Sequence, residues 1–86
     1  MKYFVYILEC ADGTLYAGIT TNIERRVKEH NEDARGAKYT RMRRPVELVY
    51  WEKCEENRSE AQKREAQLKK LTRSKKLELI SNLIDE

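Results

Sequence analysis

Runs of apolar and polar residues divide the chain into segments of regular structure. Tyr3 to Cys10 is an unbroken run of aromatic and branched residues, which is typical of a strand buried on both faces. A second such run, Thr14 to Ile19, follows the turn residues Ala11-Asp12-Gly13 and predicts a β-hairpin. A third strand is expected from Val46 to Lys53.

Three helices are expected from apolar spacing and capping residues. Asn22 is a typical N-cap for a helix from Ile23 to Glu32. Ser59 and Gln62 form a capping box, which predicts a second helix running to about Leu71. A third helix is expected from Ser74 to Leu83, and its apolar stripe comprises Leu77, Ile80, Leu83 and Ile84.

The remaining segments are expected to be irregular. Ala34 to Pro45 has no periodicity and indicates a loop, and Glu55 to Arg58 indicates a polar turn. The element order β-β-α-β-α-α predicts an α+β fold in a single domain over residues 1–86. Its three-stranded sheet, antiparallel or mixed, would be flanked by helices.

Some polar residues of the first helix fall on its apolar face. A helix advances by about 100° per residue, so Ile23 and Val27 define the inward face and His30 projects between them. Arg26 lies at the edge of that face, whereas the neighbouring Arg25 points elsewhere.

The second helix has an inward face of three residues, Ala61, Leu68 and Thr72. Glu65 projects beside them, and a carboxylate there is costly unless it is paired, hydrogen-bonded or bound to a metal. An ion pair with Arg26 or His30 and a metal site are both compatible with this position.

The hairpin register decides where two tyrosines point. A three-residue loop places Leu8 opposite Tyr16, so that Tyr6 and Tyr16 share one face of the sheet. A two-residue turn would place them on opposite faces. Tyrosines in strands often serve packing alone.

Composition and charge exclude several classes. The chain has 86 residues, with 18 basic and 15 acidic residues and a net charge of +3, which excludes a histone-like protein. No apolar run approaches the about 20 residues that span a bilayer, so we expect a soluble, cytoplasmic protein without membrane contact. Cys10 and Cys54, even with His30, do not have zinc-site spacing and are expected to be ordinary thiols.

Basic residues gather between Ala34 and Val46, while acidic residues gather from Glu52 to Glu60. An aromatic residue is interleaved with the basic ones, which suits contact with a nucleic-acid backbone; a solvated surface is the alternative. The candidate binding residues are Arg35, Lys38, Tyr39, Arg41, Arg43 and Arg44.

An ordered set of residues resembles the GIY-YIG nuclease superfamily. Val5-Tyr6-Ile7 and Tyr16-Ala17-Gly18 stand where its two tripeptides belong, and the run from Ile19 to His30 is similar to the family's segment with Arg and His. Glu65 matches the family's metal-binding glutamate. The stretches GAKYTR and LKKLTRSKK resemble the small, single-domain bacterial branch called YhbQ-like.

The resemblance implies a metal-dependent DNA endonuclease with a role in DNA repair or recombination. Its candidate catalytic residues are Tyr6, Tyr16, Arg26, His30 and Glu65. Glu65 would hold Mg²⁺ or Mn²⁺, which polarises the phosphate and stabilises the leaving 3′ oxygen. Arg26 would bind the non-bridging oxygens.

The general base is left open between two residues. By resemblance Tyr6 is the base, Tyr16 positions the water or the phosphate, and His30 orients Tyr6 or contacts phosphate. Arg26 and the metal would lower the pKa of Tyr6 from about 10. His30 has the more suitable unperturbed pKa.

Departures from the family pattern affect specificity more than chemistry. Val5 and Ala17 replace the usual Gly and Ile. Leu77 stands near the position where several family nucleases carry a supporting asparagine, so that contact is expected to be missing here. Without an appended recognition domain, the nuclease would select substrate structure rather than sequence, or rely on a protein partner. A non-catalytic nucleic-acid-binding module using residues 35–44 is the alternative, and an adaptor using the acidic segment is a third interpretation.

Overall fold

The computed structural model describes residues 2–32, 35–55 and 57–84. Three strands, β1 (Tyr3–Glu9), β2 (Leu15–Thr20) and β3 (Glu47–Cys54), form one antiparallel sheet in the order β2-β1-β3. The helices are α1 (Ile23–Glu32), α2 (Lys38–Arg41), α3 (Arg58–Lys70) and α4 (Arg73–Ile84). The α+β class, the three strands and the three long helices confirm the prediction, with ends within about two residues.

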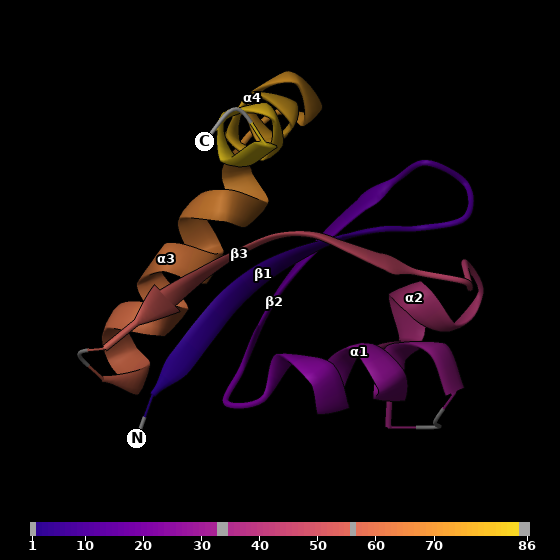
Figure 1. Ribbon diagram of the computed structural model, residues 1–86, viewed down its shortest axis with the longest axis horizontal. Helices are drawn as coiled ribbons and strands as arrows, with labels where there is room; N and C mark the ends of the chain where they lie inside the picture. The colour runs from indigo at the N-terminus through magenta and orange to yellow at the C-terminus, as the bar shows by residue number, and fades with distance from the viewer. Residues whose placement is uncertain (1, 33–34, 56, 85–86) are drawn as a thin grey trace.

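Strand β1 is the centre of the fold because both of its faces are covered (Figure 1). Val5 and Ile7 pack with Ala61 and Leu68 on the side of α3 and α4. Tyr6 and Leu8 face the opposite side, where Val27 of α1 packs against them. A strand covered on both faces needs a continuous apolar run, and this is why the segment YFVYILE lacks alternation.

The hairpin adopts the three-residue alternative. Leu8 lies opposite Tyr16, and Tyr6 lies opposite Gly18. The Cys10 N–H donates to the Thr14 carbonyl at 2.8 Å, and Gly13 adopts a φ of +83°, which favours glycine at that turn position. Tyr6 and Tyr16 therefore share the face that is covered by α1.

The start of α3 differs from the prediction. Asn57, rather than Ser59, is the N-cap: its backbone is extended, and its Oδ1 accepts from the Glu60 N–H at 2.9 Å. Asparagine is as good a cap as serine, and both precede the same helix, so the sequence does not separate them. The predicted polar turn therefore ends one residue before Arg58.

The junction between α3 and α4 also corrects two predictions. Thr72 is exposed and does not continue the inward face of α3. Helix α3 ends at Lys70, and the Thr72 side chain instead accepts from the Lys75 N–H at 3.2 Å at the start of α4. On α4, Leu77 is 42% exposed, while Leu79 and Ile80 pack on the core. The side chains of Leu83 and Ile84 lie outside the described part of the chain.

The segment predicted as a loop between residues 34 and 45 contains the single-turn helix α2. A single turn is too short to show periodicity, so its formation depends on tertiary contacts. The two cysteines, Cys10 and Cys54, are free thiols. In the described ranges, no helix combines the length and the apolar character that crossing a bilayer requires.

Candidate active site

Tyr6 stands at the centre of the candidate site. It lies in the middle of β1, is 1% exposed, and its hydroxyl is 2.8 Å from Nε2 of His30. A Cβ atom on Gly18 would lie 2.4 Å from both Cζ and the hydroxyl oxygen of Tyr6. The ring of Tyr6 therefore lies across Gly18 of the neighbouring strand, and the glycine leaves the space that the tyrosine occupies.

We predict that Gly18→Ala displaces the Tyr6 ring and breaks its hydrogen bond to His30. The added methyl group overlaps a buried side chain, which costs about 1–3 kcal/mol of folding stability. Urea denaturation measures that loss, and the imidazole NMR signals of His30 report the lost bond. Ala17→Gly is the matched control, since Ala17 is also buried in β2 but belongs to the other face of the sheet. Unchanged His30 signals in Gly18→Ala would contradict the prediction.

His30 is held in one tautomer by a chain of buried hydrogen bonds. Its Nδ1 lies 2.8 Å from the Thr40 Oγ1, and that hydroxyl donates to the Ala37 carbonyl at 2.9 Å. Because the Thr40 hydroxyl proton is used by Ala37, Oγ1 accepts from Nδ1–H of His30. Nε2 is then unprotonated and accepts from the Tyr6 hydroxyl.

Thr40 is the residue that the sequence interpretation missed. It is fully buried in α2, within the segment predicted as an irregular basic loop. A hydroxyl residue among Arg and Lys carries no periodic signal, and only the docking of α2 against α1 shows its partner.

Burial dominates the proton affinities of this pair. It raises the pKa of Tyr6 to about 12, although the Arg26 guanidinium beside it acts in the opposite direction. Burial, together with the charge of Arg26, lowers the pKa of His30 to about 4. The expected lowering by Arg26 is present, but burial outweighs it, so the pKa of Tyr6 lies above its usual value in the protein without a bound metal. The further lowering expected from a metal ion stays a prediction. At neutral pH both side chains are uncharged.

Because His30 is buried and neutral, we predict that the free energy of unfolding depends on pH. The unfolded chain binds a proton near pH 6.5 and the folded protein only near pH 4, so stability is lost as the pH falls between these values. From about pH 6.5 to about pH 5 the loss is about 2 kcal/mol. Urea denaturation at several pH values measures it. The chain has one histidine, so His30→Gln should remove the slope in this window; a slope unchanged in that variant would refute the assignment.

Arg26 is fixed beside the tyrosine by partners on two segments. Its Nη1 lies 2.8 Å from Oε1 of Glu29 and donates to the Arg35 carbonyl at 2.8 Å. The Arg26 side chain is 25% exposed, against 57% for Arg25. The structure therefore agrees with the prediction that Arg26 is the inward member of the pair. Its guanidinium keeps a solvent-facing part, which can meet an anion.

Tyr16 is held by aromatic contacts. Its ring centroid lies 5.3 Å from that of His30, and it stacks on Tyr39 of α2 at 5.7 Å. Arg43 covers Tyr39, with its guanidinium carbon 3.9 Å from the ring centroid. Burial raises the pKa of Tyr16. Tyr39 and Arg43 thus support Tyr16 in this structure.

Glu65 approaches the same group from α3. Its side chain is 20% exposed, and its ion pair is with Lys69, at 3.8 Å. The predicted alternative of an ion pair with Arg26 or His30 is wrong, because Arg26 is paired with Glu29. Besides burial, which has the larger effect, the negative charge of Glu65 also raises the pKa of Tyr6 and of Tyr16. Tyr6, Tyr16, Arg26 and His30 therefore lie together, and the charge of Glu65 acts on the hydroxyls of the two tyrosines.

Comparison with known proteins accounts for this gathering. The model of the GIY-YIG catalytic domain matches residues 2–78. This chain belongs to the GIY-YIG family. The family is one of nucleases, which act on nucleic acids and are generally dependent on a divalent metal ion. The resemblance found in the sequence is thereby confirmed.

The most informative relatives are UPF0213 proteins, which are small GIY-YIG proteins. One from Desulfotalea psychrophila is 62% identical over 91% of this chain and 70% of its own length. One from Syntrophus aciditrophicus is 57% identical over 92% and 90%. A solution structure of a UPF0213 protein from Bacillus halodurans is 46% identical, with a TM-score of 0.58 over 94% of this chain and 84% of that one. A solution structure of a protein from E. faecalis is also 46% identical, with a TM-score of 0.65 over 100% of this chain and 90% of that one.

Glu65 is the residue that would hold the metal ion of a GIY-YIG nuclease in this chain. Among the described residues, there is no group of three or more His, Cys, Asp or Glu side chains that could hold a metal ion. The part-exposed carboxylate of Glu65 fits Mg²⁺ or Mn²⁺, because Mg²⁺ in particular keeps several waters and needs few protein ligands.

Arg43 and Arg44 of the basic segment contact other parts of this GIY-YIG domain. Arg44 Nε donates to the His30 carbonyl at 2.6 Å, at the end of α1. Arg43 Nε lies 3.1 Å from Oδ2 of Asp12 in the hairpin turn. The segment predicted as a flexible basic loop is therefore docked on α1 and on the hairpin. Three other predicted binding residues, Arg35, Lys38 and Arg41, are exposed.

Proposed function

We propose that this chain is an endonuclease that hydrolyses DNA phosphodiester bonds with Mg²⁺ or Mn²⁺ bound at Glu65. The observation that carries the proposal is the hydrogen bond between Tyr6 and His30 beside the fixed guanidinium of Arg26. Tyr16 and Glu65 border the same group.

Arg26 binds the non-bridging oxygens of the scissile phosphate. Its ion pair with Glu29 and its hydrogen bond to the Arg35 carbonyl orient the guanidinium before substrate arrives. A planar donor matches two phosphate oxygens at once, which a lysine ammonium does not. Tyr16 flanks this position and orients the attacking water or the phosphate.

Tyr6 and His30 together take up the proton of the attacking water. The oxygen of water forms a bond to phosphorus while the bond from phosphorus to the 3′ oxygen breaks. The proton of water goes to the Tyr6 oxygen, and the Tyr6 hydroxyl proton goes to Nε2 of His30. A tyrosine with a raised pKa does not ionise by itself at neutral pH, so it needs this acceptor. The proposal thus gives the two candidate bases, Tyr6 and His30, a shared role.

Substrate binding favours the transfer to His30. The charge of Arg26 contributes to the low pKa of His30. A phosphate that pairs with Arg26 offsets that charge, so the pKa of His30 is expected to rise when substrate binds. A metal ion on Glu65 would stabilise the leaving 3′ oxygen and favour ionisation of Tyr6.

Thr40 positions His30 for this transfer, and Thr40→Val should expose its role. Valine leaves Nδ1–H of His30 without an acceptor, so the preference for an unprotonated Nε2 is lost. We expect a fall in kcat of about tenfold to hundredfold, with about 1–3 kcal/mol of lost stability. The pH profile of cleavage and ¹⁵N NMR of the imidazole tautomer measure the effect.

Thr40→Ser is the matched control, since serine retains the acceptor. It should keep the wild-type tautomer and most of the activity. An unchanged tautomer in Thr40→Val would show that Thr40 has only a packing role.

Selection by substrate structure is part of the proposal, as is a role in DNA repair or recombination. The arginines around the site are suited to phosphates, and phosphate contacts carry no base sequence. A protein partner that adds specificity is compatible with this arrangement.

A cleavage panel tests the proposed function. The protein is incubated with branched, flapped and plain duplex DNA in the presence of Mg²⁺, Mn²⁺ or EDTA. The expected result is cleavage that needs the metal and prefers branched or flapped DNA. No cleavage of any of these substrates would overturn the proposal.

Binding without cleavage would favour the non-catalytic module instead. Salt-dependent binding that weakens in Arg41→Ala but not in Glu65→Ala would identify that alternative.

A further inference from the structure

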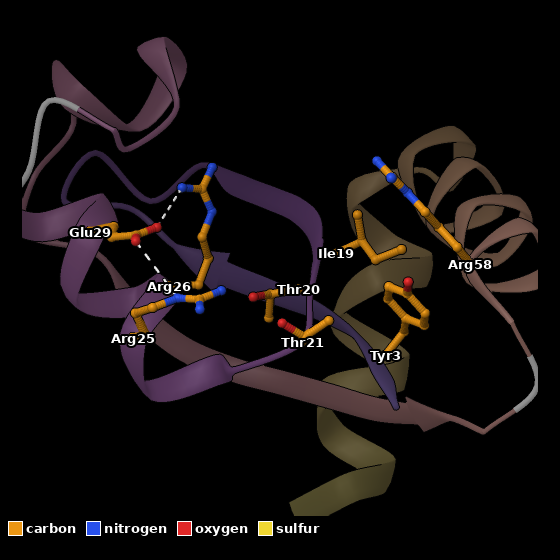
Figure 2. Close-up of a pocket in the computed structure, with 8 residues that line it drawn as sticks. All are labelled: Tyr3, Ile19, Thr20, Thr21, Arg25, Arg26, Glu29 and Arg58. Carbon is orange, nitrogen blue, oxygen red and sulfur yellow. Dashed lines mark hydrogen bonds and ion pairs between the residues drawn. The ribbon is translucent and has the colours of Figure 1, made fainter. Parts of the chain in front are cut away.

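A cavity of about 370 Å³ lies beside the candidate active site (Figure 2). Arg25, Arg26 and Glu29 of α1 form one wall, and Tyr3 and Arg58 stand on the opposite side. Pockets that bind ligands have volumes of about 300–1,000 Å³, so the space suits a group of nucleotide size. Arg26 lines this cavity and is also the proposed ligand of the scissile phosphate, so the cavity and the proposed phosphate position adjoin at Arg26.

The cavity carries an excess of positive charge. Three arginines face one carboxylate, and that carboxylate is already shared: Glu29 lies 2.8 Å from Arg26 and 3.7 Å from Arg25. The guanidinium of Arg58 makes no ion pair or hydrogen bond with any residue that the structure describes, and Figure 2 shows it standing away from α3. A cation whose donors are all available beside a polar cavity can bind an anion without breaking an existing contact.

We propose that this cavity binds the phosphate next to the scissile one on the same DNA strand, with Arg58 as its principal ligand. The inference rests on the proposed function, which places the scissile phosphate at Arg26. The strand then runs from the Tyr6–His30 pair, past Arg26, to the first turn of α3. Arg25 lies on the wall of the cavity opposite Arg58, and the Thr21 side chain lines the cavity between Arg25 and Arg58.

A phosphate bound at Arg58 would affect which DNA structures the protein selects. An arginine in a concave site contacts the phosphate backbone of one strand, and this contact does not depend on the base sequence. A cavity of this size accommodates single-stranded DNA more readily than a strand that is base-paired in a duplex. The preference for flapped or branched DNA would then arise from the shape of this cavity.

Binding of single-stranded DNA in EDTA tests the inference without any cleavage. The probe is a short, fluorescently labelled oligothymidylate, and anisotropy gives its dissociation constant over a series of salt concentrations. Arg58→Ala is expected to weaken binding about tenfold and to lower the slope of log K against log salt by about 0.7, the value for one phosphate contact on a single strand. Arg58→Lys should keep the slope, because it keeps the charge.

Lys63→Ala is the matched control. It removes one positive charge from the same helix, but Lys63 lies outside the cavity and is paired with Glu60. Its dissociation constant and slope should stay close to those of the wild type. If Arg58→Ala and Lys63→Ala behave alike, the inference is wrong, even where the cleavage panel succeeds.

The two proposals fail separately. A protein that cuts DNA while Arg58→Ala binds like the wild type retains the proposed function and loses this site. A protein that cuts no DNA, yet loses affinity and slope in Arg58→Ala, retains an Arg58-dependent phosphate site and loses the proposed function.

Discussion

Cleavage is expected to fall at least about a thousandfold when Glu65 is replaced by alanine. Glu65 is the acidic side chain whose charge acts on the hydroxyls of both Tyr6 and Tyr16, so the variant removes the carboxylate that would hold the divalent ion. Loss of the ion removes stabilisation of the leaving oxygen, which no other described side chain at the site replaces. The rate of cleavage of a flapped substrate with Mg²⁺ measures the effect.

Glu60→Ala is the control for this variant. Glu60 lies on the same helix and pairs with Lys63, so the substitution changes the net charge equally but leaves the site intact. Titration with Mn²⁺, followed by its relaxation of water protons, adds a readout that does not depend on activity. Glu65→Ala should lose this binding and Glu60→Ala should keep it. Wild-type Mn²⁺ affinity in Glu65→Ala would exclude Glu65 as the ligand.

Removing the hydroxyl of Tyr6 should have the second large effect. Tyr6→Phe keeps the ring that packs across Gly18 but loses the atom that accepts the proton of water. General acid–base catalysis contributes about 10²–10⁴-fold, so we expect a fall of about a thousandfold in kcat. Single-turnover kinetics at saturating substrate separates this loss from a change in binding.

Tyr50→Phe is the matched control for the lost hydroxyl. Tyr50 lies on β3 and donates to Glu52 at 3.0 Å, so the variant also loses one hydrogen bond but none at the site. It should cleave DNA at the wild-type rate. Equal activity in Tyr6→Phe and Tyr50→Phe would rule out a chemical role for the Tyr6 hydroxyl.

Several features of the site were predictable because they depend on local pattern. The inward projection of Arg26 and His30 follows from helical geometry once Ile23 and Val27 define the buried face. The same reasoning places Glu65 beside Leu68. The common face of Tyr6 and Tyr16 was predictable only as one of two alternatives, because one residue in the turn reverses it.

Other features could not be predicted because their partners are distant in the chain. The low pKa of His30 depends on complete burial, and burial depends on the packing of α1 against the sheet. The prediction for the pKa of Tyr6 counted the charges of Arg26 and of a metal ion. It had the direction of the Arg26 effect right but omitted the larger cost of desolvation, which depends on the same packing.

Short-range spacing in the sequence was sufficient to predict the strands and the long helices, and the resemblance of its motifs indicated the family and the chemical types at the candidate site. The tertiary structure alone decided the tautomer of His30, through Thr40, and the cavity between Arg26 and Arg58. Both depend on segments brought together across the fold. Hydrogen bonding and desolvation act through space over a few ångströms, so they become visible only when those segments meet.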